Sequence, residues 1–298
     1  MNPESYRALC AYRDEVKAIC EELTPLSPKL KSLASEASKT DTPEYPLEHP
    51  VVYNRDYDTI AQESSIRLIV IGDNPGKEEQ MEKNCRYLVG QSGRVAEGFF
   101  RRNHELGIDF RANTLITNKT PIHTAKTAHL KKLIQNGGQD IQNAIETSQR
   151  EMAQATARLH RQMLASGEAV QLFLVGYAEL KPKGIFSLYR DTLASCYKED
   201  KEAWNHVLVF QHFSMNRFLV DLKQNRTPEE QLEAAITRLG TRHRQEIFGC
   251  LQRVGVQSGR GMPPGVSRHH RTKKGGCRQT APWHKRYRFT LKTCASLT

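Results

Sequence analysis

Four short apolar runs mark the middle of the chain: RLIVIG at 67–72, NTLITN at 113–118, QLFLVG at 171–176 and HVLVF at 206–210. The runs are rich in Val, Ile and Leu without a regular polar alternation, which is typical of strands buried on both faces of a parallel sheet. Three segments with helical spacing separate them, at 94–106, 140–166 and 184–195. Strands that alternate with helices of this length predict an α/β fold built on a parallel sheet.

Further helical patterns lie on both sides of this region. Residues 3–22 place apolar side chains at near-helical spacing and predict an amphipathic helix. The Pro-, Ser- and Lys-rich stretch that follows, up to residue 50, is typical of a linker or a loosely packed arm. A last helix is predicted over 228–248, because Thr227 suits the N-cap, Pro228 suits the first helical position, and two Glu residues follow in the first turn.

The formal net charge of +11 has one origin in the sequence. Eleven of the 44 Lys and Arg lie between Arg253 and Lys292, no Asp or Glu follows Phe248, and the preceding part holds equal numbers of basic and acidic residues. DNA contact before that point would therefore need a local basic patch. The basic segment has no apolar periodicity and is predicted to be disordered. We expect three regions: an N-terminal helix and linker arm over 1–50, a folded domain over 51–249, and a basic tail over 250–298.

The cysteines argue against a disulfide framework and against a metal centre. There are seven of them, an odd number, and no two form a CxxC pair that would suit a thiolate-rich zinc or iron–sulphur site. We therefore expect no metal and no cofactor. No apolar run reaches the roughly 18 residues of a membrane span. The polar first ten residues, with Glu4 among them, do not resemble a secretory signal, so we expect a cytoplasmic protein with no membrane partner.

Polar clusters follow three of the predicted strands: GDNPG at 72–76, TNKTP at 117–121 and QHFSMN at 211–216. In parallel α/β sheets, ligands bind outside the carboxyl ends of the strands, so these clusters should converge in one crevice. The chemistry of their side chains can be read from residue type. Glycines around Asp73 and Asn74 allow close approach of a ligand to the backbone. Asn118 offers a donor and an acceptor, which match the mixed edge of a pyrimidine.

The same clusters hold groups suited to bond cleavage. His212 can donate a hydrogen bond to an oxygen that gains negative charge as a bond breaks. Either Asp73 or Asn74 can orient a water or stabilise a developing cation. These parts fit dissociative cleavage of an N-glycosidic bond, in which the base leaves as an anion and the sugar becomes oxocarbenium-like.

In order and spacing, GDNPG, then YLVGQSG at 87–93, then TNKTP and HFSMN resemble the uracil-DNA glycosylase superfamily over about residues 60–225. That superfamily is a Rossmann-like, three-layer α/β/α sandwich with a four-stranded parallel sheet, and its members remove uracil from DNA. The resemblance implies strand order 2-1-3-4 and a monomeric DNA repair glycosylase that acts on uracil or another damaged base in DNA.

The resemblance is to two branches at once, and it suggests roles for individual residues. The Asn-Pro-Gly core is similar to the mismatch-specific and single-strand-selective enzymes, in which the Asn at the Asn74 position orients the water. YLVGQSGR is similar to the PFVGxxGR stretch of the iron–sulphur branch, in which an acidic residue follows the first glycine, as Asp73 does. His212 and Ser214 match the His-Pro-Ser-type motif, whose His contacts uracil O2 and whose loop enters the minor groove. The implied site has Asp73, Asn74 and His212 as catalytic residues, Gly72, Gly76, Tyr87, Leu88, Asn118 and Ser214 around the base, and Lys119, Met215, Asn216 and Arg217 on the DNA.

Departures from the superfamily pattern leave other functions open. Leu88 stands where the iron–sulphur branch has a stacking Phe, Phe213 stands at the middle Pro of the His-Pro-Ser motif, and the cluster cysteines have no counterparts. One alternative is a catalytically inactive DNA or nucleobase binder on the same fold. Another is an unrelated nucleotide- or phosphate-binding protein that uses a helix start after Gly76, although the chain has no GxGxxG or GxxxxGK[ST] run.

Overall fold

The computed structural model describes residues 1–254, and its core is a sheet of four parallel strands. The strands are β1 (Leu68–Gly72), β2 (Thr114–Asn118), β3 (Gln171–Val175) and β4 (Val207–Phe210). Their order in the sheet is β2-β1-β3-β4, and every neighbouring pair is parallel. This arrangement confirms the predicted α/β fold and the strand order 2-1-3-4. The register sets Gly72 beside Asn118, so the polar clusters after β1 and β2 begin at the same edge.

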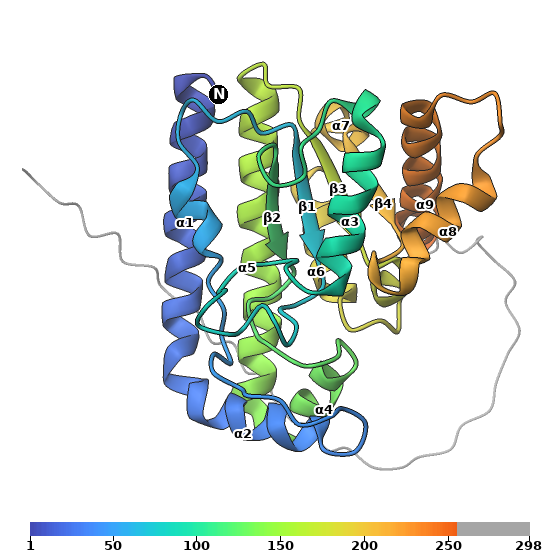
Figure 1. The fold of residues 1–298 in the computed structure, drawn as a ribbon. Coiled ribbons are helices and arrows are strands. Elements are labelled where there is room, and N and C mark those ends of the chain that lie inside the picture. Colours follow the sequence, from blue (N-terminus) through green and yellow to red (C-terminus); the bar gives the residue numbers. More distant parts are fainter. Residues whose placement is uncertain (255–298) are drawn as a thin grey trace, which may run out of the picture. The chain divides into compact units, whose positions relative to one another are not determined.

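Helices cover both faces of the sheet (Figure 1), as a sandwich requires. On one face lies α3 (Gln91–Arg102); on the other lie α5 (Gly138–Ala165) and α6 (Ser187–Cys196). The N-terminal helix α1 (Pro3–Leu23) packs along α5 and reaches the sheet, where the Tyr12 hydroxyl lies 2.8 Å from Thr117 Oγ1. The last helix, α9 (Leu232–Val254), packs on β4.

The segment expected to be a linker contains a packed helix, so that expectation is wrong for Ser27–Ser38, which form α2. Leu30, Ala34 and Ala37 lie on one helical face and are buried. The helix packs against α4 (His129–Asn136), and Lys132 Nζ donates to the carbonyl of Ala37 at 2.8 Å (Figure 1). Prolines mark the start of the segment, where a helix accepts them because the first N–H groups have no intrahelical partner.

The last helix differs from its prediction at both ends. It begins at Leu232 rather than at Pro228, and Glu230, which lies before the helix, accepts a hydrogen bond from Arg238 Nη2 at 2.7 Å. It continues to Val254, so the first five residues of the predicted tail are helical. The prediction of disorder otherwise concerns residues that lie outside the described part of the chain.

The remaining helical segments are short. They are α7 (Lys201–Asn205), α8 (Arg217–Asn225) and the 3₁₀ turns Thr24–Leu26, Arg55–Thr59, His104–Leu106, Tyr177–Leu180 and Ser214–Asn216. Within residues 1–254, no helix combines the length and the apolar character needed to cross a membrane.

Candidate functional site

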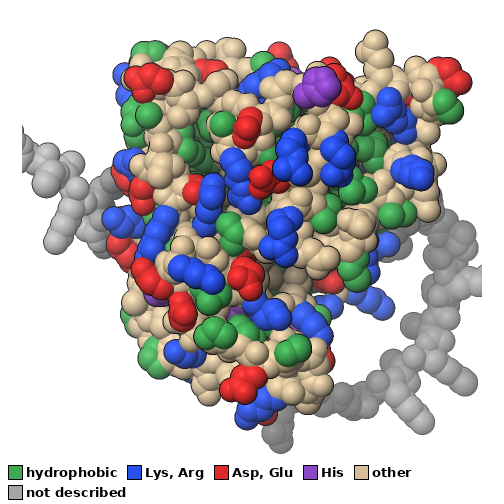
Figure 2. Space-filling model, in the orientation of Figure 1, with side chains coloured by type: hydrophobic (Ala, Val, Ile, Leu, Met, Phe, Trp, Pro, Cys, Tyr) green, Lys and Arg blue, Asp and Glu red, His purple; other side chains and the backbone are tan. Residues whose placement is uncertain are grey.

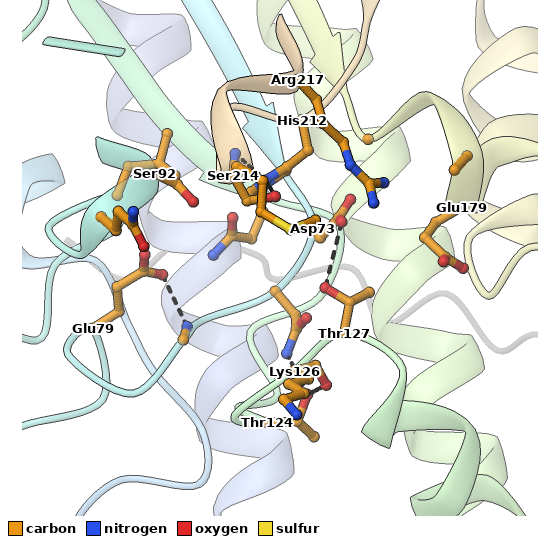
Figure 3. A pocket seen from close by; sticks show the side chains of 18 of the residues that line it. Asp73, Glu79, Ser92, Thr124, Lys126, Thr127, Glu179, His212, Ser214 and Arg217 are labelled. Carbon is orange, nitrogen blue, oxygen red and sulfur yellow. Dashed lines mark hydrogen bonds between the residues drawn. The ribbon is translucent and has the colours of Figure 1, made fainter. Parts of the chain in front are cut away.

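A crevice of about 650 Å³ opens at the carboxyl edge of the sheet and is lined from the loops that follow all four strands (Figure 3). It brings together most of the predicted site residues: Asp73, Asn74, Gly76, Leu88, Asn118, His212, Ser214, Met215 and Arg217. Gly72, Tyr87, Lys119 and Asn216 do not line it. The convergence follows from the parallel sheet, since all carboxyl ends lie at one edge.

Asp73, directly after β1, is an ionised carboxylate that is almost completely buried, with 7% of the residue exposed. Its Oδ1 accepts a hydrogen bond from Lys119 Nζ at 2.6 Å, and its Oδ2 lies 3.4 Å from Thr127 Oγ1. Burial alone would raise the pKa of Asp73. The positive charge of Lys119 and the hydrogen bonds from Lys119 and Thr127 outweigh that effect and lower the pKa below its usual value.

Lys119 does not face the solvent, so the predicted phosphate contact is wrong. Its side chain is fully buried, and Nζ donates to Gly72 O at 3.0 Å, Asp73 Oδ1 at 2.6 Å and Val175 O at 2.7 Å. These bonds use all three donors of the ammonium group. Lys119 thus joins the ends of β1, β2 and β3 and fixes the position of the Asp73 carboxylate.

Two glycines make room for the polar side chains of the crevice. A Cβ atom at Gly72 would lie 2.3 Å from Asn118 Oδ1, and a Cβ atom at Gly176 would lie 2.2 Å from Asp73 Oδ1. Gly176 also has φ +96°, a conformation that favours glycine. Gly72 therefore acts on the site by admitting the Asn118 side chain rather than by touching a ligand.

Asn118, the last residue of β2, carries a hydrogen-bond donor that no described group of the protein satisfies. The residue is 1% exposed, it lines the crevice, and its Nδ2 has no hydrogen-bond partner within residues 1–254. A buried polar group without a partner costs about 1–3 kcal/mol. A ligand acceptor in the crevice would remove that cost.

Asn74 is held by the loop that follows β2. Its Nδ2 donates to Thr124 Oγ1 at 2.8 Å and to Ile122 O at 3.2 Å. Those bonds commit the amide nitrogen, while its Oδ1 has no donor among the described residues and remains able to accept a hydrogen bond. Asn74 is thereby suited to accept a hydrogen bond through Oδ1 from a group in the crevice.

His212, after β4, is a neutral imidazole whose proton position follows from its neighbours. Its Nδ1 accepts the backbone N–H of Ser214 at 3.0 Å, so in the neutral ring the proton lies on Nε2. Burial lowers the pKa of His212, and although Asp73 acts in the opposite direction, the net shift is downward. His212 therefore offers an Nε2–H donor at neutral pH, and Figure 3 shows its ring close to Asp73 and Ser214.

The turn after His212 has an unusual backbone that exposes an apolar side chain at the crevice. Met215 and Asn216 have φ of 52° and 56°, in the left-handed region that side chains other than glycine rarely adopt. Met215 is 67% exposed and lines the crevice, whereas Asn216 does not. The turn thus presents an apolar side chain to the solvent beside the crevice.

Tyr87 and Phe213 belong to the core. Tyr87 is fully buried and its hydroxyl donates to Val52 O at 2.6 Å, so its predicted contact with a base is wrong. Phe213 is also fully buried and packs against Phe218, with ring centroids 5.0 Å apart. Leu88 does line the crevice, and among the described lining residues none is Phe, Tyr or Trp. The crevice therefore has no aromatic platform for a base.

Glu79 is a lining residue that the sequence analysis missed. It lies in the GKEEQ run after the first cluster, a pattern that is common on solvated surfaces. In the structure it is 7% exposed, its Oε2 accepts the N–H of Gly76 at 3.1 Å, and burial raises its pKa to about 7. Figure 3 shows it across the crevice from Arg217 and Glu179. Asp73, Glu79 and Glu179 all line the crevice, and burial moves the pKa of Glu79 to about 7, close to neutral pH.

The phosphate-binding alternative loses its structural basis. It required a helix start after Gly76, whereas the following residues form turns and α3 begins only at Gln91. Comparison of the chain with models of protein families, with curated proteins and with solved structures finds no match. The function of the crevice has to follow from its own residues.

Proposed function

We propose that this protein is a DNA glycosylase that hydrolyses the N-glycosidic bond of uracil, or of a related deaminated base, in DNA. The observation that carries the proposal is the convergence of Asp73, Asn118 and His212 in one crevice, each in a protonation or hydrogen-bonding state that suits this reaction. The reaction needs a base leaving as an anion, a cationic sugar and a water, and the crevice offers a group for each.

The leaving base is bound by Asn118 and His212. The free Nδ2 of Asn118 donates to a carbonyl oxygen of the pyrimidine, and its Oδ1 accepts the neighbouring ring N–H. The Nε2–H of His212 donates to the oxygen on which negative charge develops. A neutral imidazole donor suits this role, because it stabilises the anion without first giving up a proton.

The two residues that follow β1 interact with the sugar and with the water. The ionised carboxylate of Asp73 stabilises the positive charge that develops on the sugar. Asn74 accepts a hydrogen bond from the water through Oδ1 and so orients its lone pair towards the anomeric carbon. When the water adds to that carbon it loses one proton, which the departing base anion takes up, so the base is released neutral. Since Asp73 is held by Lys119 and Asn74 by Thr124, both groups are in place before the substrate binds.

DNA approaches the mouth of the crevice, where Met215, Lys126 and Arg217 line it. Figure 2 shows Lys and Arg side chains interspersed with Asp and Glu over one face, in keeping with the equal numbers of basic and acidic residues before the tail. Arg217 supplies a local cation for a phosphate, whereas Lys126 is paired with Asp41, whose Oδ2 lies 3.4 Å from its Nζ. Met215 fills the space that a flipped nucleotide leaves in the stack.

A catalytically inactive nucleobase or DNA binder on the same fold is the second candidate. The crevice favours it in one respect: Leu88 occupies the position of an aromatic platform, and no other described aromatic side chain replaces it. Base–aromatic stacking contributes about 1–3 kcal/mol in nucleic-acid binding, so its absence weakens the hold on a flipped base.

Release of free base separates the two candidates. The full-length protein is incubated with single- and double-stranded oligonucleotides that carry uracil, hypoxanthine or xanthine, and abasic sites are revealed by alkaline strand scission. The glycosylase proposal expects scission at a deaminated base and none in undamaged DNA. Selective binding without scission would establish the binder, and neither binding nor scission across the panel would overturn both.

A further inference from the structure

Three side chains with metal-ligating atoms meet outside the crevice: His49, Glu82 and Cys85. One ring nitrogen, one carboxylate oxygen and the sulfur all lie within 4.8 Å of one another, and His49 Nε2 is 2.7 Å from Glu82 Oε2. Zinc in a tetrahedral site binds such atoms at about 2.0–2.3 Å, which places neighbouring ligand atoms about 3.5 Å apart. Small side-chain shifts would therefore bring the three atoms to zinc distances.

The backbone already holds the segments that carry these ligands. The N–H of His49 donates to the carbonyl of Gln80 at 3.2 Å, and the N–H of Arg55 donates to the carbonyl of Cys85 at 2.9 Å. The segment before β1 is thus bound to the loop after β1 at two points, one on each side of the cluster. Because the backbone is fixed in this way, binding of an ion would require little ordering of the chain.

The surroundings of Glu82 orient its carboxylate as a ligand. Arg55 Nη2 donates to Oε1 at 2.6 Å and Arg55 Nη1 donates to the Glu82 carbonyl at 3.0 Å, while Oε2 faces His49. Ligating carboxylates are commonly hydrogen-bonded in this way by residues behind them.

The charges of the cluster balance those of a divalent ion. A thiolate at Cys85 and the carboxylate of Glu82 together carry two negative charges, which equal the charge of the ion. Cys85 is buried, while the side chains of His49 and Glu82 are 39% and 60% exposed, so an ion can enter from the solvent. A set of one nitrogen, one sulfur and one oxygen ligand suits zinc rather than magnesium or calcium, which prefer oxygen alone.

We propose that His49, Glu82 and Cys85 bind one zinc ion through imidazole nitrogen, carboxylate oxygen and thiolate sulfur, with water in the fourth position. On binding, Zn²⁺ displaces the thiol proton of Cys85 to the solvent, with no change of oxidation state. The ion joins the segment before β1 to the loop that leads into Leu88 of the crevice. Its role is to stabilise that loop, which makes the site independent of the proposed glycosylase chemistry.

Cobalt(II) tests the site directly, because a cobalt–thiolate bond absorbs in the near ultraviolet whether or not the protein is an enzyme. Full-length protein is freed of metal with a chelator, titrated with Co²⁺ and then with Zn²⁺. We expect a charge-transfer band that saturates at one Co²⁺ per chain and disappears as Zn²⁺ displaces it. Absence of the band at micromolar concentrations, together with no zinc binding by calorimetry, would overturn the proposal.

Variants assign the ligands. Cys85→Ser should abolish the band, and His49→Ala and Glu82→Gln should each weaken binding strongly, whereas Cys196→Ser, a partly buried cysteine outside the cluster, should leave it unchanged. Arg55→Met should weaken binding about 10–100-fold, as is typical when a residue behind a ligand is lost. Far-ultraviolet circular dichroism verifies that each variant is folded. A band that persists in folded Cys85→Ser would show that the metal is bound elsewhere.

Discussion

The ammonium of Lys119 lies 2.6 Å from Oδ1 of Asp73, and neither side chain is more than slightly exposed. The pair sits where β1, β2 and β3 end, and the other two protons of Lys119 bind the carbonyls of Gly72 and Val175. A buried pair gains from its Coulomb attraction and loses hydration, so its net stabilisation can be small. Its effect here is positional: Asp73 stays ionised, and its second oxygen is directed towards Thr127 and the crevice.

Removing one partner of this pair should lower the free energy of unfolding far more than removing both. In Lys119→Met a buried carboxylate is left without its partner, which costs about 3–5 kcal/mol in the free energy of unfolding at neutral pH. The double change Lys119→Met with Asp73→Asn should recover most of that loss. Urea unfolding of the four proteins in a double-mutant cycle measures the coupling, and strictly additive losses would refute it.

The stability lost in Lys119→Met should depend on pH in a predictable direction. Lys119 holds the pKa of Asp73 below its usual value, so this stabilisation is present at neutral pH and is lost as the pH falls through the lowered pKa. Without Lys119, burial raises the pKa of Asp73. The stability gap between wild type and Lys119→Met should therefore narrow as the pH becomes acidic, and a constant gap would contradict the assignment.

Loss of the side chain of either Asn74 or His212 should slow base release without unfolding the protein. Asn74→Ala removes the acceptor proposed for the water, and His212→Ala removes the donor proposed for the leaving base. Each should lower the single-turnover rate on the order of 100-fold or more. Gln162→Ala, at an exposed position of α5 outside the crevice, is the control and should change the rate little. An unchanged rate in either variant would mean that the residue has been given the wrong role.

Gly176 can be tested against a glycine of similar backbone conformation. In Gly176→Ala a methyl group would lie 2.2 Å from Asp73 Oδ1, in addition to the strain of φ +96°. Gly167 has φ +87° with open space around its Cβ position, so Gly167→Ala carries only the strain, about 1 kcal/mol or somewhat more. We expect both variants to lose stability but only Gly176→Ala to lose base release, measured at equal folded fractions. Equal activity of the two would show that the Asp73 carboxylate is less constrained than we argue.

Glu79 should make stability fall as the pH rises. Burial raises its pKa from 4.5 to about 7, so the folded state binds a proton more tightly than the unfolded chain does. The stabilisation is complete below about pH 4.5 and is lost as the pH approaches 7. Glu79→Gln stays neutral, so its free energy of unfolding should gain about 3 kcal/mol relative to wild type across that interval. Chemical denaturation at several pH values measures the difference, and a flat difference would rule out the raised pKa.

The strands were predictable to within one residue, because a strand buried on both faces needs an uninterrupted apolar run and little else in this chain supplies one. Once the sheet is parallel, its carboxyl ends share an edge, so Asp73, Asn118 and His212 could be placed together without knowledge of any loop. The helix α2 was missed because its proline and its four serines outweigh a sparse apolar face when the sequence is judged locally.

What the sequence did not reveal depends on loops and on burial. Lys119 looks like any surface lysine in TNKTP, and only the crossing of three strand ends makes it an internal ion-pair partner. Tyr87 was expected at the base but lies in the core, and Glu79, which was not expected there, lines the crevice. The turns between residues 77 and 90 decide which of the two faces the crevice. The cluster of His49 with Glu82 joins residues 33 apart, a spacing that no local metal motif contains.

The charge distribution leads to a prediction about the basic tail. Ten of the eleven Lys and Arg between Arg253 and Lys292 follow Val254, where α9 ends. A cationic segment adds affinity for any DNA by releasing counterions, with a salt slope of about −0.9 per phosphate neutralised on a duplex. Contacts with phosphates carry no sequence information, so such a segment cannot choose a base.

Removal of residues 255–298, which leaves α9 whole, should therefore weaken binding to undamaged and damaged duplexes alike at low salt and flatten the salt dependence. The choice among damaged bases should be unchanged, because Asn118 and His212 are untouched. Duplex affinity and base release of the truncated protein, measured over a salt series, check both expectations. If the truncated protein were inactive at saturating DNA, or released a different base, the tail would have to be part of the site. The proposal that the crevice selects the base while the tail only adds affinity for DNA would then be wrong.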